Sequence, residues 1–292
     1  MRSVRSVSCL KPSLLARGVM TFAAVAAVGA FGQDAAAALV DRWSFSETSG
    51  TTLTDSVGVH NGTIVPGTGT VSLDGQRATL SGGSNAAYIS LGSGILTGHS
   101  AATVELWATP LSIQNWSRVF DTGTSLSVTG GPSDSYIQWA WTIGSSTGSS
   151  TFGWTTNGVR NDQNLTSPFV LGQEAAIAVT ILDGAGTGGS TLVKLYVNGL
   201  LIRTFDNPAP LSGFFGNVFT LGRSLFPTDM VANASYNEVR IYDTALSAAT
   251  VQSDFLEGPN AVPEPGVLAM LGTGLLGLGL IRRFSTSAAT AT

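Results

Sequence analysis

The chain of 292 residues contains one cysteine, two histidines and few charges, since Asp, Glu, Lys and Arg make up only 11% of it. The cysteine, Cys9, precedes every segment that we expect to fold. We therefore expect neither a disulfide framework nor a thiolate metal site in the folded part. With His60 and His99 as the only histidines, a three-histidine zinc site is excluded, and a Ser-His-Asp arrangement would have to use one of the two.

Positive charge is scarce in the middle of the chain. Residues 39–260 carry eight Lys and Arg against sixteen Asp and Glu, which gives a formal net charge of −8, and Lys194 is the one lysine among them. Nucleic-acid binding needs clustered cations that displace counterions from phosphates, so this composition argues against it. An anionic membrane surface is an equally poor partner for this part of the chain.

The N-terminal segment has the order of a secretory signal peptide. Four basic residues occur within residues 1–17, an apolar stretch runs from Val19 to Phe31, and small residues follow from Ala35 to Ala38. An Ala-x-Ala site after an apolar stretch is typical of signal-peptidase cleavage. We predict that residues 1–38 are removed on export.

The C-terminal segment combines a proline-flanked acid, an apolar run and a basic pair. Pro263, Glu264 and Pro265 are followed by sixteen uncharged residues, 266–281, and then by Arg282 and Arg283. The two prolines keep the backbone extended, and the apolar run falls just short of the roughly 17–25 residues of a membrane-spanning helix. We predict a linker at 259–265, a transmembrane helix at 266–281 and a cytoplasmic basic tail at 282–292.

This tail resembles the PEP-CTERM sorting signal of exopolysaccharide-producing Gram-negative bacteria. The resemblance implies an exosortase-type enzyme as partner. It also implies a precursor held in the inner membrane by the C-terminal helix and then release toward the cell surface or extracellular matrix. An ordinary C-terminal membrane anchor is the alternative interpretation.

Short alternating apolar runs separated by turn residues dominate residues 39–258. In Thr191–Val197 alternate residues are apolar while Lys194 points the other way, and Asn198-Gly199 separates this run from the next, Leu200–Phe205. Asn-Gly between two apolar runs predicts a type I′ hairpin, because both central residues of that turn need positive φ. Further strands are predicted at 103–109, 117–120, 136–142, 175–181, 218–221 and 237–242, and one short helix near 246–256 that begins at Ser247. We predict an all-β, two-sheet antiparallel jelly-roll sandwich.

Several blocks then resemble the laminin-G-like, concanavalin A-like jelly-roll family, in the order in which that family has them. They are Trp43–Gly50, Asp55–Gly58, His60–Thr63, Thr103–Pro110, Arg118–Gly123, Leu195–Gly199, Leu221–Arg223 and Asn237–Ser247. Together they span about residues 40–257. The resemblance implies the jelly-roll fold and calcium bound by loop oxygens, for which Asp55, Asp121 and Glu238 are the candidates. The alternative is that these carboxylates cap turns.

Aromatic residues are the best candidates for recognition. Trp139 and Trp141 share one strand face, and Trp154 repeats that spacing next to Phe152, so a hairpin of the two segments would place these rings on one surface. Such rings either stack against sugars or fill the core. Trp116 follows a predicted loop and is a candidate for an exposed contact.

No catalytic constellation is recognisable. Laminarinase-type enzymes on this fold carry Glu-x-Asp-x-x-Glu on one strand, and that spacing does not occur here. We expect a non-catalytic surface or matrix protein that binds extracellular polysaccharide. A carbohydrate-active enzyme with carboxylates from separate strands and a purely structural matrix component are the alternatives.

Overall fold

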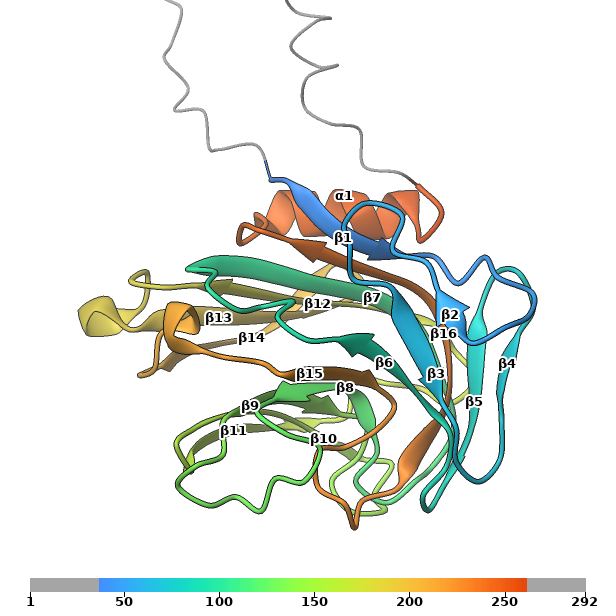
Figure 1. The fold of residues 1–292 in the computed structure, drawn as a ribbon. Coiled ribbons are helices and arrows are strands. Elements are labelled where there is room, and N and C mark those ends of the chain that lie inside the picture. The colour runs from blue at the N-terminus through green and yellow to red at the C-terminus, as the bar shows by residue number, and fades with distance from the viewer. Residues whose placement is uncertain (1–36, 262–292) are drawn as a thin grey trace, which may run out of the picture. The chain divides into compact units, whose positions relative to one another are not determined.

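The computed structural model describes residues 37–261, and within them two antiparallel sheets pack face to face (Figure 1). The predicted jelly-roll sandwich is confirmed. Within residues 37–261 the helical segments are one α-helix, α1 (Ala248–Glu257), and two 3-10 turns at Thr187–Gly189 and Leu211–Gly213. The predicted signal peptide up to residue 36, the linker from 262, the transmembrane helix and the basic tail lie outside the described residues. No helix of residues 37–261 is long and apolar enough to cross a membrane.

The first sheet contains the longest strands and follows the order β14-β13-β12-β7-β16-β5-β4, with β1 also paired to β16. β1 and β5 share the same edge of β16: residues 231–236 pair with β5 and residues 239–242 with β1. The strands are β1 (Leu39–Trp43), β4 (Val71–Leu73), β5 (Ala78–Gly83), β7 (Ala101–Ser112), β12 (Ala175–Leu182), β13 (Thr191–Val197), β14 (Leu200–Asn207) and β16 (Val231–Tyr242).

The second sheet follows the order β11-β10-β9-β8-β15-β6-β3-β2. Its strands are β2 (Thr52–Leu53), β3 (Gly62–Val65), β6 (Tyr88–Gly92), β8 (Arg118–Gly123), β9 (Tyr136–Ala140), β10 (Ser149–Thr156), β11 (Val159–Thr166) and β15 (Val218–Leu221). At one edge of the sandwich β11 and β14 approach each other, since the Asn161 side chain donates to the carbonyl of Asp206. All strands predicted from the alternation pattern are present, and β16 begins six residues earlier than predicted.

The predicted hairpin and helix are both confirmed. Asn198 and Gly199 have φ angles of 51° and 72°, as a type I′ turn requires, and they connect β13 to β14. Helix α1 (Ala248–Glu257) begins after Ser247, whose hydroxyl accepts a hydrogen bond from the backbone N–H of Thr250. α1 lies over the outer face of the first sheet, beside β1 (Figure 1).

The core lies between the inner faces of the two sheets and contains the largest aromatic side chains. Trp43, Trp139, Trp154, Phe120 and Phe152 are all fully buried in it. Because strand residues alternate between faces, every second residue of β8, β9 and β10 points away from this core. Those residues form the outer face of the second sheet.

Candidate functional site

A row of polar and small residues crosses the outer face of the second sheet. The registers place Asp162 of β11 opposite Gly153 of β10, Gly153 opposite Gln138 of β9, Gln138 opposite Asp121 of β8, and Asp121 opposite Thr220 of β15. Directly opposed residues of antiparallel strands lie on the same face. We call this set the outer-face row.

The side chains in and beside the middle of the row are buried from solvent, but two of them have a polar atom with no hydrogen-bond partner among the described residues. Gln138 is 2% exposed, and its Oε1 has no hydrogen-bond partner among the described residues. Thr151, on the same face of β10, is 3% exposed, and its Oγ1 is likewise unpartnered. A buried polar atom without a partner is costly, so such atoms are expected where a ligand or ordered water completes the bonding.

The side chains of the two neighbours of Gly153 in the row fill the space above this glycine. A Cβ atom at this position would lie 2.7 Å from Oδ1 of Asp162 and 2.8 Å from Nε2 of Gln138. Both side chains therefore lean over the glycine from the adjacent strands. The missing side chain is what lets a carboxylate and an amide converge above the sheet.

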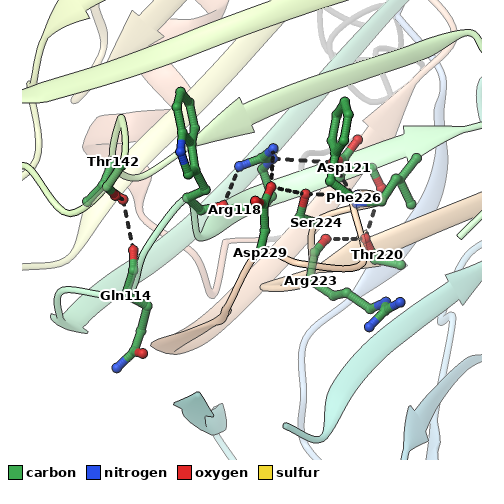
Figure 2. Close-up of polar contacts among 12 residues, drawn as sticks. Gln114, Arg118, Asp121, Thr142, Thr220, Arg223, Ser224, Phe226 and Asp229 are labelled. Carbon is green, nitrogen blue, oxygen red and sulfur yellow. Dashed lines mark hydrogen bonds and ion pairs between the residues drawn. The ribbon is translucent and has the colours of Figure 1, made fainter. Parts of the chain in front are cut away.

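An arginine anchors the other side of the row. Arg118 donates to Oδ2 of Asp229 at 2.9 Å and to Oδ2 of Asp121 at 3.3 Å, and it also donates to the carbonyl of Trp116 (Figure 2). The hydroxyl of Ser224 donates to the same Asp229 oxygen at 2.7 Å. This network connects the segment after β15 to β8. Together the two segments form one wall of the candidate site.

Asp121 lies beneath that wall. Its side chain is fully buried, and its Oδ2 accepts from the backbone N–H of Leu225 at 3.0 Å. Burial raises the pKa of Asp121 to about 7, although Arg118 and the Leu225 N–H both act to lower it. Asp121 thus connects Arg118 and the backbone of Leu225 within the wall.

A pocket of about 140 Å³ opens between these elements. It is lined by Trp116, Arg118, Gln138, Arg160, Phe226 and Asp229. We call it the outer-face pocket. Trp116 and Phe226 give it aromatic walls, and Arg160, whose side chain is 54% exposed, stands at its rim paired with Asp162 at 2.6 Å.

A larger pocket of about 260 Å³ lies elsewhere, beside Trp141 and Phe169. Its lining is mainly apolar and contains no charged side chain, only hydroxyl groups such as those of Thr142 and Thr147. The smaller pocket carries the charged, amide and aromatic groups that a polar ligand requires. We therefore assign the candidate site to the outer-face pocket.

Three of the four predicted ligand-binding tryptophans do not face solvent. Trp139 and Trp154 are 0% and 1% exposed, Trp141 is 4% exposed, and all three belong to the core. The predicted hairpin exists, since Trp139 pairs with Phe152 in register. The exposed platform is wrong, because this face of the hairpin packs against the first sheet. Trp116, held at φ 53°, lines the outer-face pocket, and Trp141 lines the larger pocket of mainly apolar character.

The three predicted calcium ligands are engaged with different protein donors. Oδ1 of Asp55 accepts from the backbone N–H groups of Arg42, Val57 and Gly58, so Asp55 caps the turn, as the alternative interpretation expected. Glu238 accepts from Arg240 at 2.9 Å and pairs with Arg42. Asp121 lies in the second sheet with Arg118. The set therefore does not form a common site.

A different trio brings its ligand atoms together. Asp41, Asp55 and His60 each place one within 4.8 Å of the others. Nδ1 of His60 and Oδ1 of Asp41 are 2.6 Å apart. Burial raises the pKa of Asp41 to about 6, with His60 opposing the shift and Asp55 adding to it. This trio connects β1 to the loop before β3.

The residues that build the pocket were missed in the sequence, apart from Trp116. Gln138 alternates with Ile137 and Trp139, so placing those two residues in the core would have assigned Gln138 to the outer face. Asp229 and Arg160 carry no such signal, because they reach the site only through the pairing of distant strands.

The family model of the concanavalin A-like lectin/glucanases superfamily matches residues 82–252, which are more than half of the chain. The chain belongs to this superfamily. A model of the PEP-CTERM protein-sorting motif matches residues 261–283, which include the predicted Pro263, Glu264, Pro265, Arg282 and Arg283. Both resemblances are confirmed, and together they mark an exported surface protein. The sorting residues lie outside the described part of the structure.

Solved structures share the superfamily fold at low identity. Domain 4 of AbnA, an extracellular arabinanase from Geobacillus stearothermophilus in complex with arabinotriose, matches with TM-score 0.55 and 21% identity over 75% of this chain and 98% of that one. Trypanosoma rangeli sialidase in complex with sialic acid matches with TM-score 0.53 and 14% identity over 75% of this chain and 33% of that one. A structure of botulinum neurotoxin type C, whose cell entry depends on interaction with two ganglioside molecules, matches with TM-score 0.53 and 17% identity over 76% of this chain and 51% of that one. No curated protein matches the chain.

Proposed function

We propose that this protein binds extracellular polysaccharide at the cell surface without modifying it, and that the outer-face pocket is the binding site. The observation that carries the proposal is the buried, unpartnered Oε1 of Gln138 beneath a pocket walled by Trp116 and Phe226. Sugars offer hydroxyl groups to such atoms and apolar C–H faces to aromatic rings.

The solved relatives give the proposal its ligand class. The AbnA domain was solved with arabinotriose and the sialidase with sialic acid, so both of these structures contain a carbohydrate ligand. At these identities the likeness concerns the fold, and its extension to this chain is part of the proposal. The proposal also includes an exosortase-type enzyme as partner. This enzyme would process the sorting motif after transient anchoring of the precursor in the inner membrane.

An enzyme on the same fold is the second candidate, and the engagement of two carboxylates near the pocket supports our non-catalytic proposal over it. Catalysis of glycoside hydrolysis needs two carboxyl groups that reach the scissile bond from opposite sides. Asp121 is fully buried, while Asp229 accepts from Arg118 and Ser224. Carboxylates held in this way serve structure and recognition.

The proposal is tested on a glycan array with the purified full-length protein and its Trp116→Ala and Gln138→Ala variants. We expect selective binding by the parent and a loss of roughly tenfold or more in each variant, equivalent to about 1.4 kcal/mol. Unfolding midpoints measured in parallel show that the variants fold. Release of reducing ends from the bound glycan would establish the enzyme instead, and absence of any binding would favour a structural matrix component.

A further inference from the structure

The outer-face pocket also indicates which chemical class of glycan it takes. Resting on the function proposed above, we infer that the ligand is a neutral glycan, held through two neighbouring hydroxyl groups between Gln138 and Asp162 above Gly153, and that uronate-containing polysaccharides are rejected.

The first argument is the pair of groups that converge above Gly153. Oδ1 of Asp162 and Nε2 of Gln138 lie 2.7 Å and 2.8 Å from the position that a Cβ of Gly153 would occupy. The carboxylate is an acceptor, whereas the amide nitrogen is a donor and its Oε1 has no partner. A hydroxyl group both donates and accepts, so two adjacent hydroxyls satisfy this pair.

The second argument is the charge balance of the lining. Both arginines of the pocket are already paired: Arg118 with Asp229 and Asp121, and Arg160 with Asp162. Recognition of a carboxylate by arginine needs the donors of the guanidinium fork to be free. A uronate would instead face the carboxylates of Asp162 and Asp229, which offset the charges of the two arginines and leave the site no net positive charge.

The third argument is the charge of the whole folded part. Residues 39–260 carry a formal net charge of −8. A polyanion approaching this surface is repelled over distances of about 10 Å at moderate salt, whereas a neutral chain is not. Binding of the expected ligand should therefore depend little on ionic strength.

Affinity electrophoresis of the full-length protein tests the inference. Gels contain a neutral polysaccharide (dextran, arabinan or a mixed-linkage β-glucan) or an anionic one (alginate or polygalacturonate). We expect retardation in at least one neutral gel and none in the anionic gels. We also expect a dissociation constant that changes less than about twofold between about 0.05 M and about 0.5 M salt, where screening differs strongly.

Gly153→Ala provides the matched variant. Its methyl group would displace the flexible ends of Gln138 and Asp162 while leaving the backbone unstrained, so we expect a loss of tenfold or more with little change in unfolding midpoint. Gly148→Ala is the control, since its Cβ would meet nothing closer than Oγ of Ser146 at 3.9 Å.

The outcomes separate the two proposals. Tighter, salt-dependent binding to alginate or polygalacturonate would overturn the neutral class and leave the binding function standing. Neutral binding that survives Gly153→Ala unchanged would overturn the placement above Gly153. Binding to neither class would overturn the inference together with the function on which it rests.

Discussion

The guanidinium of Arg240 donates to the carbonyl oxygen of Pro259 at 2.8 Å, so a fully buried side chain of β16 holds the segment that leads into the sorting motif. The same Nη2 also donates to the carbonyls of Gly258 and Ala261. Its Nε donates to Glu238, and its Nη1 lies 3.6 Å from Glu105. One cation thus joins two buried carboxylates to the end of the described chain.

Replacement of Arg240 by Met should destabilise the domain strongly. Met keeps the unbranched apolar stem, but the carbonyls of Gly258, Pro259 and Ala261 lose their donor. Glu105 also loses its neighbouring cation, and Glu238 keeps only Arg42 in a buried setting. Breaking a buried pair in this way costs roughly 3–5 kcal/mol. Urea unfolding of the variant measures the loss, and Arg203→Met, at an exposed position of β14, should cost less than about 0.5 kcal/mol. Equal stabilities of the two variants would contradict this reading of the cluster.

Glu105 should make the stability of the domain pH-dependent. Burial raises its pKa to about 8, with the charges of Asp254 and Glu238 adding and that of Arg240 opposing. The folded state therefore holds this proton more tightly than the unfolded chain, whose value is 4.5. The contribution to stability is complete below about pH 4.5 and is lost as pH rises to about 8.

We expect Glu105→Gln to remove that dependence. The unfolding free energy of the parent, compared with the variant, should fall with a slope of up to about 1.4 kcal/mol per pH unit across this window. Parallel curves for the two proteins between pH 5 and pH 8 would show that Glu105 is ionised in the folded state.

Trp139 and Trp116 should respond to truncation in opposite ways. Trp139 fills the core and donates from Nε1 to the hydroxyl of Ser150 at 3.1 Å, so Trp139→Ala should cost about 3–5 kcal/mol of stability. Trp116→Ala should reduce glycan binding while costing much less stability. Thermal unfolding and binding measured on both variants check this, and a stable Trp139→Ala variant would place that ring outside the core.

Asp55 should act as the cap of its turn. Burial alone would raise its pKa, but backbone N–H groups of Arg42, Gly58 and His60 donate to it and bring the pKa below its ordinary value. The stabilisation is therefore present above about pH 4 and is lost as the pH falls through the folded-state pKa. Asp55→Ala should cost about 1–3 kcal/mol at pH 7, because buried N–H groups lose their acceptor.

Asp74→Ala is the comparison for that variant, since Asp74 caps an exposed turn through the N–H groups of Gln76 and Arg77. Its loss should be smaller, because water replaces the carboxylate. A calcium-dependent unfolding midpoint that disappears in Asp55→Ala would instead show that Asp55 ligates a metal ion.

The fold was predictable where local chemistry decides it. Asn198 and Gly199 specify a turn that few other pairs allow, and Ser247 caps α1 by a bond within its own first turn. Trp139 shows the limit of such reasoning. Alternation places it on a face with Trp141, but which face meets the other sheet depends on packing between elements far apart in the chain.

The site was less predictable, for the same physical reason. Gln138, Gly153 and Asp162 become neighbours only through the registers of β9, β10 and β11, and a shift of one residue would separate them. Arg118 and Asp229 are 111 positions apart. Their ion pair follows from the sandwich as a whole.

Both ends of the described chain are hydrogen-bonded to residues at or just after the end of β16. The N–H of Ala38 donates to Asp243, and Arg240 holds the carbonyls of Pro259 and Ala261. These contacts and α1 lie at the first sheet (Figure 1). The residues that line the outer-face pocket come from the second sheet and the loops beside it. Attachment of the chain through either end would therefore leave the proposed binding face uncovered, because that face and the two ends of the described chain belong to different sheets.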